Sequence, residues 1–145
     1  MVTTGIHTPD LDLAVGTVMT PYPVVVDQDT SLDEVAELLA QNDITGAPVV
    51  DDDGRLVGVI SQTDLVRTAS LATSDGRRWT GYTARHVMSR QPIIARADTP
   101  LVDAVRRLER HGVHRLIIVA EDGCTPIGIV STSDLLPLLV DATDF

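Results

Sequence analysis

Short apolar runs along the chain are interrupted by turn sequences in a way that predicts two β-hairpins. Residues 47–50 and 56–60 are almost entirely apolar, and the sequence Asp-Asp-Asp-Gly follows the first run. Residues 115–119 and 127–130 form a second such pair, with Glu-Asp-Gly between them. Glycine after acidic residues favours a tight turn between two strands. Since apolar residues occupy both faces of these runs, we expect strands in sheets that are covered on both sides.

Apolar residues spaced three and four positions apart predict a helix before each hairpin. The first helix begins at Ser31, which together with Glu34 matches the Ser-x-x-Glu pattern of a capping box. In the second helix, we expect Thr99 to take the capping position and Gly112 to end the helix.

One further strand is predicted before each of these helices, because residues 23–26 and 92–95 are short apolar runs. Each hairpin is followed by another predicted helix, at about 62–70 and 132–140. The segment 71–83 is expected to link the two halves. The predicted fold is therefore of the α/β (α+β) class, built from tandem β-α-β-β-α repeats.

The residues themselves are also duplicated. Val-Met-Thr at 18–20 returns as Val-Met-Ser at 87–89, an offset of 69 residues. Gly-Val-Ile-Ser-Gln-Thr-Asp-Leu at 58–65 returns as Gly-Ile-Val-Ser-Thr-Ser-Asp-Leu at 128–135, after one extra residue near Cys124. A match sustained over so long a stretch identifies an internal repeat.

Composition narrows the class of protein. The 145 residues are 43% hydrophobic but only 3% aromatic, so the core must consist mainly of Val, Leu, Ile and Ala. Cys124 has no second cysteine with which to pair and is interpreted as a turn residue. The first 12 residues lack the features of a signal peptide, and no apolar run approaches the roughly 20 residues of a membrane span. We expect a cytoplasmic protein without membrane contact.

The net charge is −10, and all 11 basic residues are arginines. A surface this acidic repels phosphate backbones, which argues against binding of a nucleic-acid polymer. A small anionic ligand in a locally basic cleft is compatible with the same charge.

Three motifs carry a resemblance to a known family. Gly-x-x-Ser-x-x-Asp occurs at 58–64 and 128–134, Val-Met-Thr-Pro at 18–21, and Thr-Gly-Ala-Pro-Val-Val at 45–50. In this order and in duplicate they resemble the CBS (cystathionine-β-synthase-type) domain, of which two copies form a Bateman module. The resemblance covers nearly the whole chain and implies a stand-alone CBS pair, with its repeats packed around a pseudo-twofold axis. The implied boundaries are an N-terminal segment at 1–14, a first repeat at 15–70, the linker at 71–83 and a second repeat at 84–141.

The resemblance also implies an adenosyl ligand, such as AMP, ADP, ATP or S-adenosylmethionine, in two clefts. Asp64 and Asp134 would accept hydrogen bonds from ribose hydroxyls, and Ser61 and Ser131 would lie near the first phosphate. The other residues expected to line the repeat 1 site are Thr20, Tyr22, Val24, Thr45, Ala47 and Pro48. Those expected to line the repeat 2 site are Ser89, Pro92, Ile93, His114, Arg115 and Leu116.

Elementary chemistry supports both a ligand-binding and a purely structural interpretation of the Ser-x-x-Asp junctions. A carboxylate can accept two hydrogen bonds from a vicinal diol, and a helix start offers unpaired N–H groups to a phosphate. Ser-x-x-Asp is equally a capping box, which stabilises a helix without any ligand. The two roles are compatible, because a cap uses only some of the carboxylate oxygens.

The two copies differ at the start of the first hairpin strand, where the second copy has His114-Arg115 and the first has Thr45-Gly46. A guanidinium at this position can pair with phosphate oxygens, so we expect the better phosphate site in repeat 2. The repeat 1 site would suit a weakly charged, adenosine-like ligand or stay empty. Alternatively, Arg115 forms only a surface ion pair.

Other chemistries find less support in the sequence. His111 and His114 have a spacing found in metal sites, but Gly112 ends the helix between them. Neither a nucleophile elbow nor a glycine-rich phosphate loop occurs. We therefore expect no metal, no catalytic cofactor and no enzyme activity, with an adenine nucleotide as regulatory ligand.

The C-terminal segment predicts a protein contact, because its apolar residues surround most of a helix. They are Leu135, Leu136, Leu138, Leu139 and Val140, interrupted by Pro137. Such a helix needs burial on more than one face. It is buried either within its own chain or in a homodimer, and the resemblance favours the homodimer.

The predicted function is a regulatory module that senses an adenosyl nucleotide and signals to an effector protein. The alternative is a structural or interaction protein whose clefts are vestigial. Whether Arg77, Arg78 and Trp79 in the linker touch a ligand is left open by the sequence.

Overall fold

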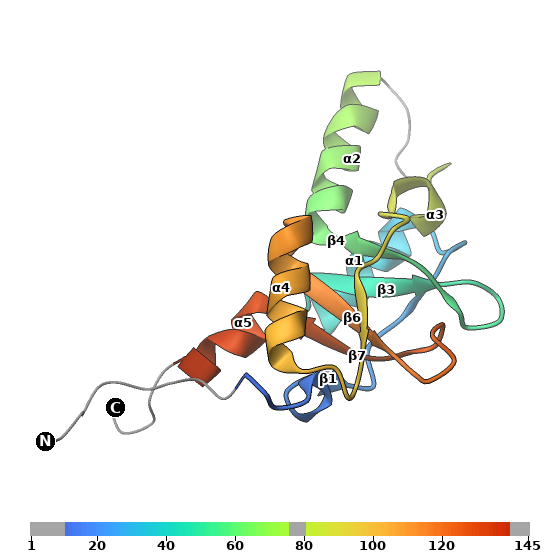
Figure 1. The fold of residues 1–145 in the computed structure, drawn as a ribbon. Coiled ribbons are helices and arrows are strands. Elements are labelled where there is room, and N and C mark those ends of the chain that lie inside the picture. The colour runs from blue at the N-terminus through green and yellow to red at the C-terminus, as the bar shows by residue number, and fades with distance from the viewer. Residues whose placement is uncertain (1–10, 76–80, 140–145) are drawn as a thin grey trace, which may run out of the picture. The chain divides into compact units, whose positions relative to one another are not determined.

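The computed structural model describes residues 11–75 and 81–139, which form two compact units (Figure 1). Unit 1 comprises the described residues up to Pro21, then Ile93–Gly123 and the chain from Ile127 onward. Unit 2 comprises Tyr22–Pro92 together with Cys124–Pro126. Arg77, Arg78, Trp79 and Val140 lie outside the described residues.

Unit 2 is built on a three-stranded sheet in the order β2-β3-β4. Strand β2 runs parallel to β3, and β3 pairs with β4 in an antiparallel hairpin, as predicted. Helix α3 lies against α2 (Figure 1). The elements are β2 (Val26–Asp27), α1 (Leu32–Gln41), β3 (Gly46–Val50), β4 (Leu56–Ser61), α2 (Gln62–Asp75) and α3 (Ala84–Val87).

Unit 1 repeats this plan on a four-stranded sheet in the order β1-β7-β6-β5. Strand β5 runs parallel to β6, and β1 pairs antiparallel with β7. The elements are η1 (Val15–Thr17), β1 (Thr20–Pro21), β5 (Ile94–Arg96), α4 (Leu101–His111), β6 (Arg115–Val119), β7 (Pro126–Ser131), α5 (Thr132–Leu135) and η3 (Leu136–Leu139).

The beginning of each repeat pairs with the body of the other repeat. In unit 1, Thr20 pairs with Ile129 of β7, although the two residues belong to different copies. In unit 2, Ser89 pairs with Val59 of β4 in the equivalent way. We call residues 11–21 and 82–92 the entry segments. Their exchange means that each compact unit contains parts of both copies.

This exchange explains the glycine of each Gly-x-x-Ser-x-x-Asp motif. A Cβ added to Gly58 would lie 2.6 Å from the backbone oxygen of Ser89, closer than real Cβ contacts. A Cβ at Gly128 would collide with the side chain of Met19. Gly58 thus leaves room for the backbone of an exchanged entry segment, whereas Gly128 leaves room for a flexible side chain of the other entry segment.

Each unit has its own aliphatic core, as the composition predicts. Strand β3 is buried along its whole length, and β6 is buried from Leu116 to Val119. The sheets are therefore covered on both faces, which confirms the interpretation of the apolar runs. Leu32 at the start of α1 and Leu101 at the start of α4 are both 0% exposed, in equivalent places.

The helix boundaries confirm some of the predicted signals and correct one of them. Ser31 caps α1, since its hydroxyl accepts a hydrogen bond from the Glu34 N–H at 3.4 Å. Gly112 ends α4 in the left-handed conformation, with φ 59°. The prediction for Thr99 was wrong, because Pro100 occupies the N-cap position. The Thr99 hydroxyl instead accepts from the Arg96 N–H at 3.0 Å, closing the turn before the helix.

Other element boundaries also differ from the predictions. The expected strands at 23–26 and 92–95 are regular only from Val26 and Ile94, since each run begins with a proline that has no N–H. Helix α2 continues to Asp75, so the first residues of the expected linker are helical. The predicted helix at 132–140 narrows to a 3-10 turn after Leu135, because Pro137 cannot donate a helical hydrogen bond.

Candidate functional site

The Ser-x-x-Asp motif of unit 2 lies where β4 passes into α2. Asp64 Oδ2 accepts hydrogen bonds from the backbone N–H of Ser61 at 2.9 Å and from its hydroxyl at 3.0 Å. The Asp64 N–H donates in return to the Ser61 hydroxyl at 3.3 Å. The motif therefore has the structural capping role that the sequence left open.

Unit 1 repeats the arrangement where β7 passes into α5. Asp134 Oδ2 accepts from the Ser131 N–H at 2.8 Å and from its hydroxyl at 3.1 Å. In both units, Oδ1 of the aspartate makes no hydrogen bond within residues 11–75 and 81–139. Both side chains are only half-buried. Each junction thus holds a carboxylate in place and leaves one of its oxygens available to a ligand.

A pocket of about 320 Å³ opens beside Asp64 within unit 2. One wall is a single face of α2, because its residues lie three and four positions apart. This face consists of Asp64, Arg67, Thr68 and Leu71. The other wall consists of Tyr82, His86 and Val87, around α3. We call this space the Asp64 pocket.

Two polar groups besides Asp64 line the Asp64 pocket. Nδ1 of His86 accepts a hydrogen bond from the Thr83 N–H at 2.9 Å, which leaves the hydrogen of the neutral imidazole on Nε2. Tyr82 contacts the His86 ring edge-on, with centroids 6.1 Å apart. The Arg67 guanidinium makes no hydrogen bond or ion pair in the described part of the chain. The pocket therefore combines an acceptor, an imidazole donor and a cation.

The other residues predicted for the repeat 1 site are not all placed alike. Tyr22 is 94% exposed and has φ 54°, while Val24 is half-buried and Thr45 exposed. Ala47 and Pro48 are buried in β3. Thr20 belongs to unit 1, because its strand pairs with β7.

The residues predicted for the repeat 2 site also differ in their exposure and in the unit to which they belong. His114 is exposed, Arg115 is half-buried and has a polar partner, and Leu116 is 0% exposed in the core. Ile93 packs against the unit 1 core. Ser89 and Pro92 belong to unit 2. Because the entry segments are exchanged, Thr20 lies in the same unit as Ser131 and Asp134. Ser89 lies in the same unit as Ser61 and Asp64.

Sequence reasoning missed Arg67, Tyr82 and His86 as candidate site residues. Arg67 carried a usable signal, since three positions separate it from Asp64 on one helix face. Tyr82 and His86 had no such signal in the sequence, because only the exchange of entry segments brings residues 82–92 to α2. Repeat 1 has no cation at the position equivalent to Arg115, and the Arg67 guanidinium lies instead beside Asp64 on α2.

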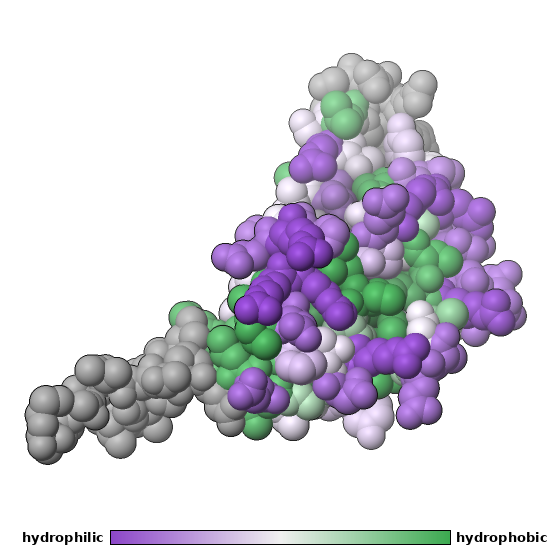
Figure 2. All heavy atoms as spheres, in the orientation of Figure 1, coloured by the Kyte–Doolittle hydropathy of each residue, from purple (hydrophilic) through white to green (hydrophobic). Residues whose placement is uncertain are grey.

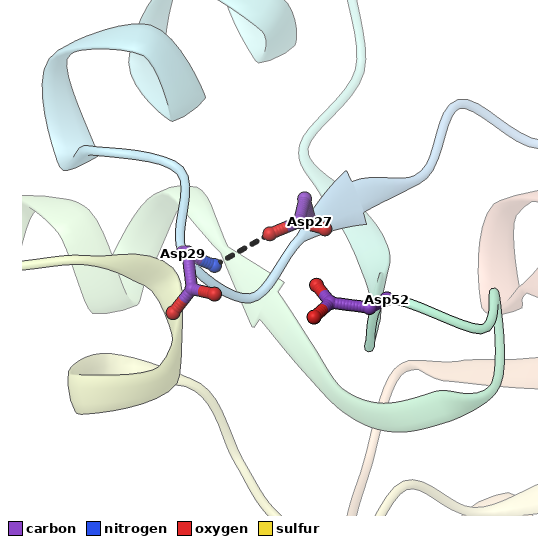
Figure 3. Close-up of side chains that lie close together, drawn as sticks. All are labelled: Asp27, Asp29 and Asp52. Atoms are coloured by element: carbon purple, nitrogen blue, oxygen red, sulfur yellow. Dashed lines mark hydrogen bonds between the residues drawn. The ribbon is translucent and has the colours of Figure 1, made fainter.

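An acidic cluster lies elsewhere in unit 2, where Asp27, Asp29 and Asp52 approach one another (Figure 3). All three side chains are exposed. Asp27 accepts a hydrogen bond from the Asp29 N–H at 2.8 Å, and Asp29 forms an ion pair with Arg85. A turn hydrogen bond and an arginine therefore account for Asp27 and Asp29, while Asp52 makes no hydrogen bond or ion pair with the described residues.

Each unit also has an apolar groove between its two helices. The groove between α1 and α2 has a volume of about 380 Å³, and Val66 on its edge is 70% exposed. The groove between α4 and the C-terminal helical segment has about 460 Å³, and Leu136 there is 60% exposed. Figure 2 shows apolar surface beside α4 and α5. Val66 and Leu136 occupy equivalent positions of the two copies.

The fold and the two capped aspartates define a duplicated domain of the kind that the motifs resemble. The CBS domain family matches residues 15–70 and 84–141. The chain therefore belongs to the CBS domain family, as a pair of CBS domains.

Individual relatives support this assignment. The uncharacterized protein MJ1426 of Methanocaldococcus jannaschii is 32% identical, over 81% of this chain and 86% of its own length. The structure of CBSX2 from Arabidopsis thaliana in complex with AMP has a TM-score of 0.73 and 34% identity, covering 86% of this chain and 94% of that one. A homoserine O-acetyltransferase of Methanococcoides burtonii is 29% identical over 87% of this chain, which spans only 24% of that protein.

Within the described ranges, every helix is too short or too polar to cross a membrane.

Proposed function

We propose that this chain is a regulatory module that binds an adenosyl nucleotide at the Ser-x-x-Asp junction of each repeat. The carrying observation is that both aspartates are fixed through Oδ2, while Oδ1 makes no hydrogen bond to any described residue. A carboxylate oxygen held in this way can accept hydrogen bonds from ribose hydroxyls without any loss of the helix cap. The AMP complex of the relative CBSX2 supports an adenosyl ligand.

Each proposed site combines a junction with the surfaces predicted around it. The exchanged entry segments change one part of that assignment. We propose that Ser89 contributes near Ser61 and Asp64, and Thr20 near Ser131 and Asp134. Arg115 and His114 would serve the phosphate end of the unit 1 site.

Signalling would follow from differential binding. A ligand that binds one arrangement of the repeats more tightly than another shifts the population toward that arrangement. An effector protein that distinguishes the arrangements then responds to nucleotide level. In this proposal the chain performs no catalysis of its own and works in the cytoplasm.

We further propose that the chain forms a homodimer through the two apolar grooves. Val66 and Leu136 are large apolar side chains left mostly exposed at equivalent places. Burial of apolar surface contributes about 25 cal/mol per Å², so two matched grooves per chain favour a second copy. The two-fold symmetry of a dimer would let identical patches meet.

Thermal unfolding with AMP, ADP, ATP, NAD or S-adenosylmethionine tests the proposed function. A ligand at 100 times its dissociation constant should stabilise the chain by about 2.7 kcal/mol and raise its Tm by several degrees. Asp64→Asn combined with Asp134→Asn should remove the shift, because the charged acceptor is lost at both junctions. Asp52→Asn with Asp98→Asn is the matched control, since it removes two exposed carboxylates elsewhere and should keep the shift.

The alternative is an interaction protein with vestigial clefts, and the apolar grooves are the observation in its favour. It predicts that none of these compounds changes the Tm. That result would overturn the proposed nucleotide-binding function and leave the grooves as the functional surface.

A further inference from the structure

We infer that the Asp64 pocket selects adenosyl ligands that carry a phosphate, with Arg67 and His86 as the groups that hold it. The inference rests on the proposed function and adds the ligand class and the residues that select it. In this assignment Asp64 accepts from the ribose, and the two donors contact phosphate oxygens.

Asp64 and Arg67 are three residues apart, which places their side chains on one face with Cβ atoms roughly 5–6 Å apart. Both line the same pocket of about 320 Å³, a volume within the usual range for small-molecule sites. In the inferred binding mode, a ribose bonded to Asp64 directs its 5′ substituent toward the Arg67 guanidinium.

The opposite wall of the Asp64 pocket contains His86. The hydrogen bond from the Thr83 N–H fixes His86 Nδ1 as an acceptor and directs the ring's donor capacity to Nε2. His86 lines the pocket across from α2, so an anion there can bind both Nε2–H and the guanidinium. Two donors of this kind match the several acceptor oxygens of a phosphate.

The chain has a net charge of −10, and Asp64 by itself would repel an anion. Arg67 offsets that charge and has no carboxylate partner in the described ranges, unlike Arg85, which pairs with Asp29. A phosphate supplies the missing partner, whereas a cationic ligand such as S-adenosylmethionine would face an arginine.

Isothermal titration of adenosine and AMP tests the inference, because these probes differ only in the phosphate. All proteins are full-length and carry Asp134→Asn, so that the unit 2 site dominates the signal. We expect AMP to bind at least tenfold more tightly than adenosine. Arg67→Met should bring the two affinities within about threefold of each other, since a charged hydrogen bond contributes about tenfold to a hundredfold in affinity.

Two further variants test whether the preference for AMP comes from the proposed phosphate contacts, and not from the net charge of the protein or from a folding defect. His86→Asn keeps an acceptor for the Thr83 N–H but removes the Nε2 donor, and should weaken AMP and leave adenosine unchanged. Arg55→Met removes the same charge from the exposed β3–β4 turn of unit 2 and should preserve the preference for AMP.

The outcomes are distinguishable. Equal binding of AMP and adenosine by the protein with intact Arg67, or equal loss of both in Arg67→Met, would overturn phosphate selection while sparing the proposed function. If neither compound binds, the proposed nucleotide site of unit 2 fails, and phosphate selection fails with it.

Discussion

Units 1 and 2 share one framework but differ in the groups beside their aspartates. The capping geometry at Ser61 and Asp64 is repeated at Ser131 and Asp134 within a few tenths of an ångström. By contrast, the three polar residues of the Asp64 pocket have no polar equivalents of the same kind. Arg67, Tyr82 and His86 correspond to Pro137, Leu13 and Thr17.

This comparison separates two kinds of residue in the duplication. Residues that hold backbone together, such as the junction serines and the motif glycines, are the same in both copies. The residues beside the junction aspartates differ, although the aspartates themselves are the same. If both junctions bind a ligand as proposed, they would have the same frame and different chemistry.

Substitutions in the two cores should have the largest effect and test whether the two copies share one framework. Leu32→Ala and Leu101→Ala each remove a fully buried side chain at equivalent helix starts. Each should lower the free energy of unfolding by about 2–5 kcal/mol through lost burial and a residual cavity. Urea unfolding followed by circular dichroism measures both. A loss in only one variant would contradict equivalent packing of the two copies.

The motif glycines should reveal a smaller, unequal effect. A methyl group at Gly58 meets the backbone oxygen of Ser89, which cannot move aside, whereas at Gly128 it meets the flexible side chain of Met19. Gly58→Ala should therefore cost about 1–3 kcal/mol, and Gly128→Ala less.

The same urea experiment compares the two glycine variants. Gly54→Ala is no suitable control, because Gly54 has φ 77° and its substitution is strained for another reason. Gly81→Ala is suitable, since nothing lies within 4 Å of the added carbon, and it should leave stability nearly unchanged. Equal losses at Gly58 and Gly128 would remove the distinction between backbone and side-chain contact.

The grooves should give the smallest effect on folding and a clear effect on assembly. Leu136→Asp and Val66→Asp place a charge on exposed positions, so each monomer should remain folded. Light scattering should show the homodimer weakened in both, and more in Leu136→Asp because its groove is larger. Leu71→Asp, equally exposed but outside both grooves, is the control. A monomeric mass for the unmodified chain would overturn the proposed dimer.

Much of the fold could be predicted because its signals are local. The two hairpins, the cap at Ser31 and the stop at Gly112 each depend on a few neighbouring residues. The exchange of entry segments could not be predicted, since residues 18–20 carry no local sign of which copy they will pair with. The N-cap prediction for Thr99 failed because a hydroxyl near a helix start can form a hydrogen bond within the preceding turn as readily as with the helix.

For the candidate site too, residues in a local motif could be predicted, and residues brought in by packing between elements could not. Ser61, Asp64, Ser131 and Asp134 could be found because they recur as a spaced motif. Ala47 and Leu116, which the resemblance places beside a ligand, are 0% exposed in their strands, and their contact with a ligand stays a prediction. His86 depends on the packing of α3 against α2, a contact between elements that no spacing in the sequence encodes.

Exchange of the entry segments also sets an order of events during synthesis. Most of unit 2 is one continuous stretch, Tyr22–Pro92, so its strands can pair while the second repeat is still being made. Thr20 must wait for Ile129, more than 100 residues later, and closure of so long a loop carries a larger entropic cost. Unit 1 thus contains the earlier entry segment but completes its sheet later than unit 2, and β1 stays unpaired until β7 has been made.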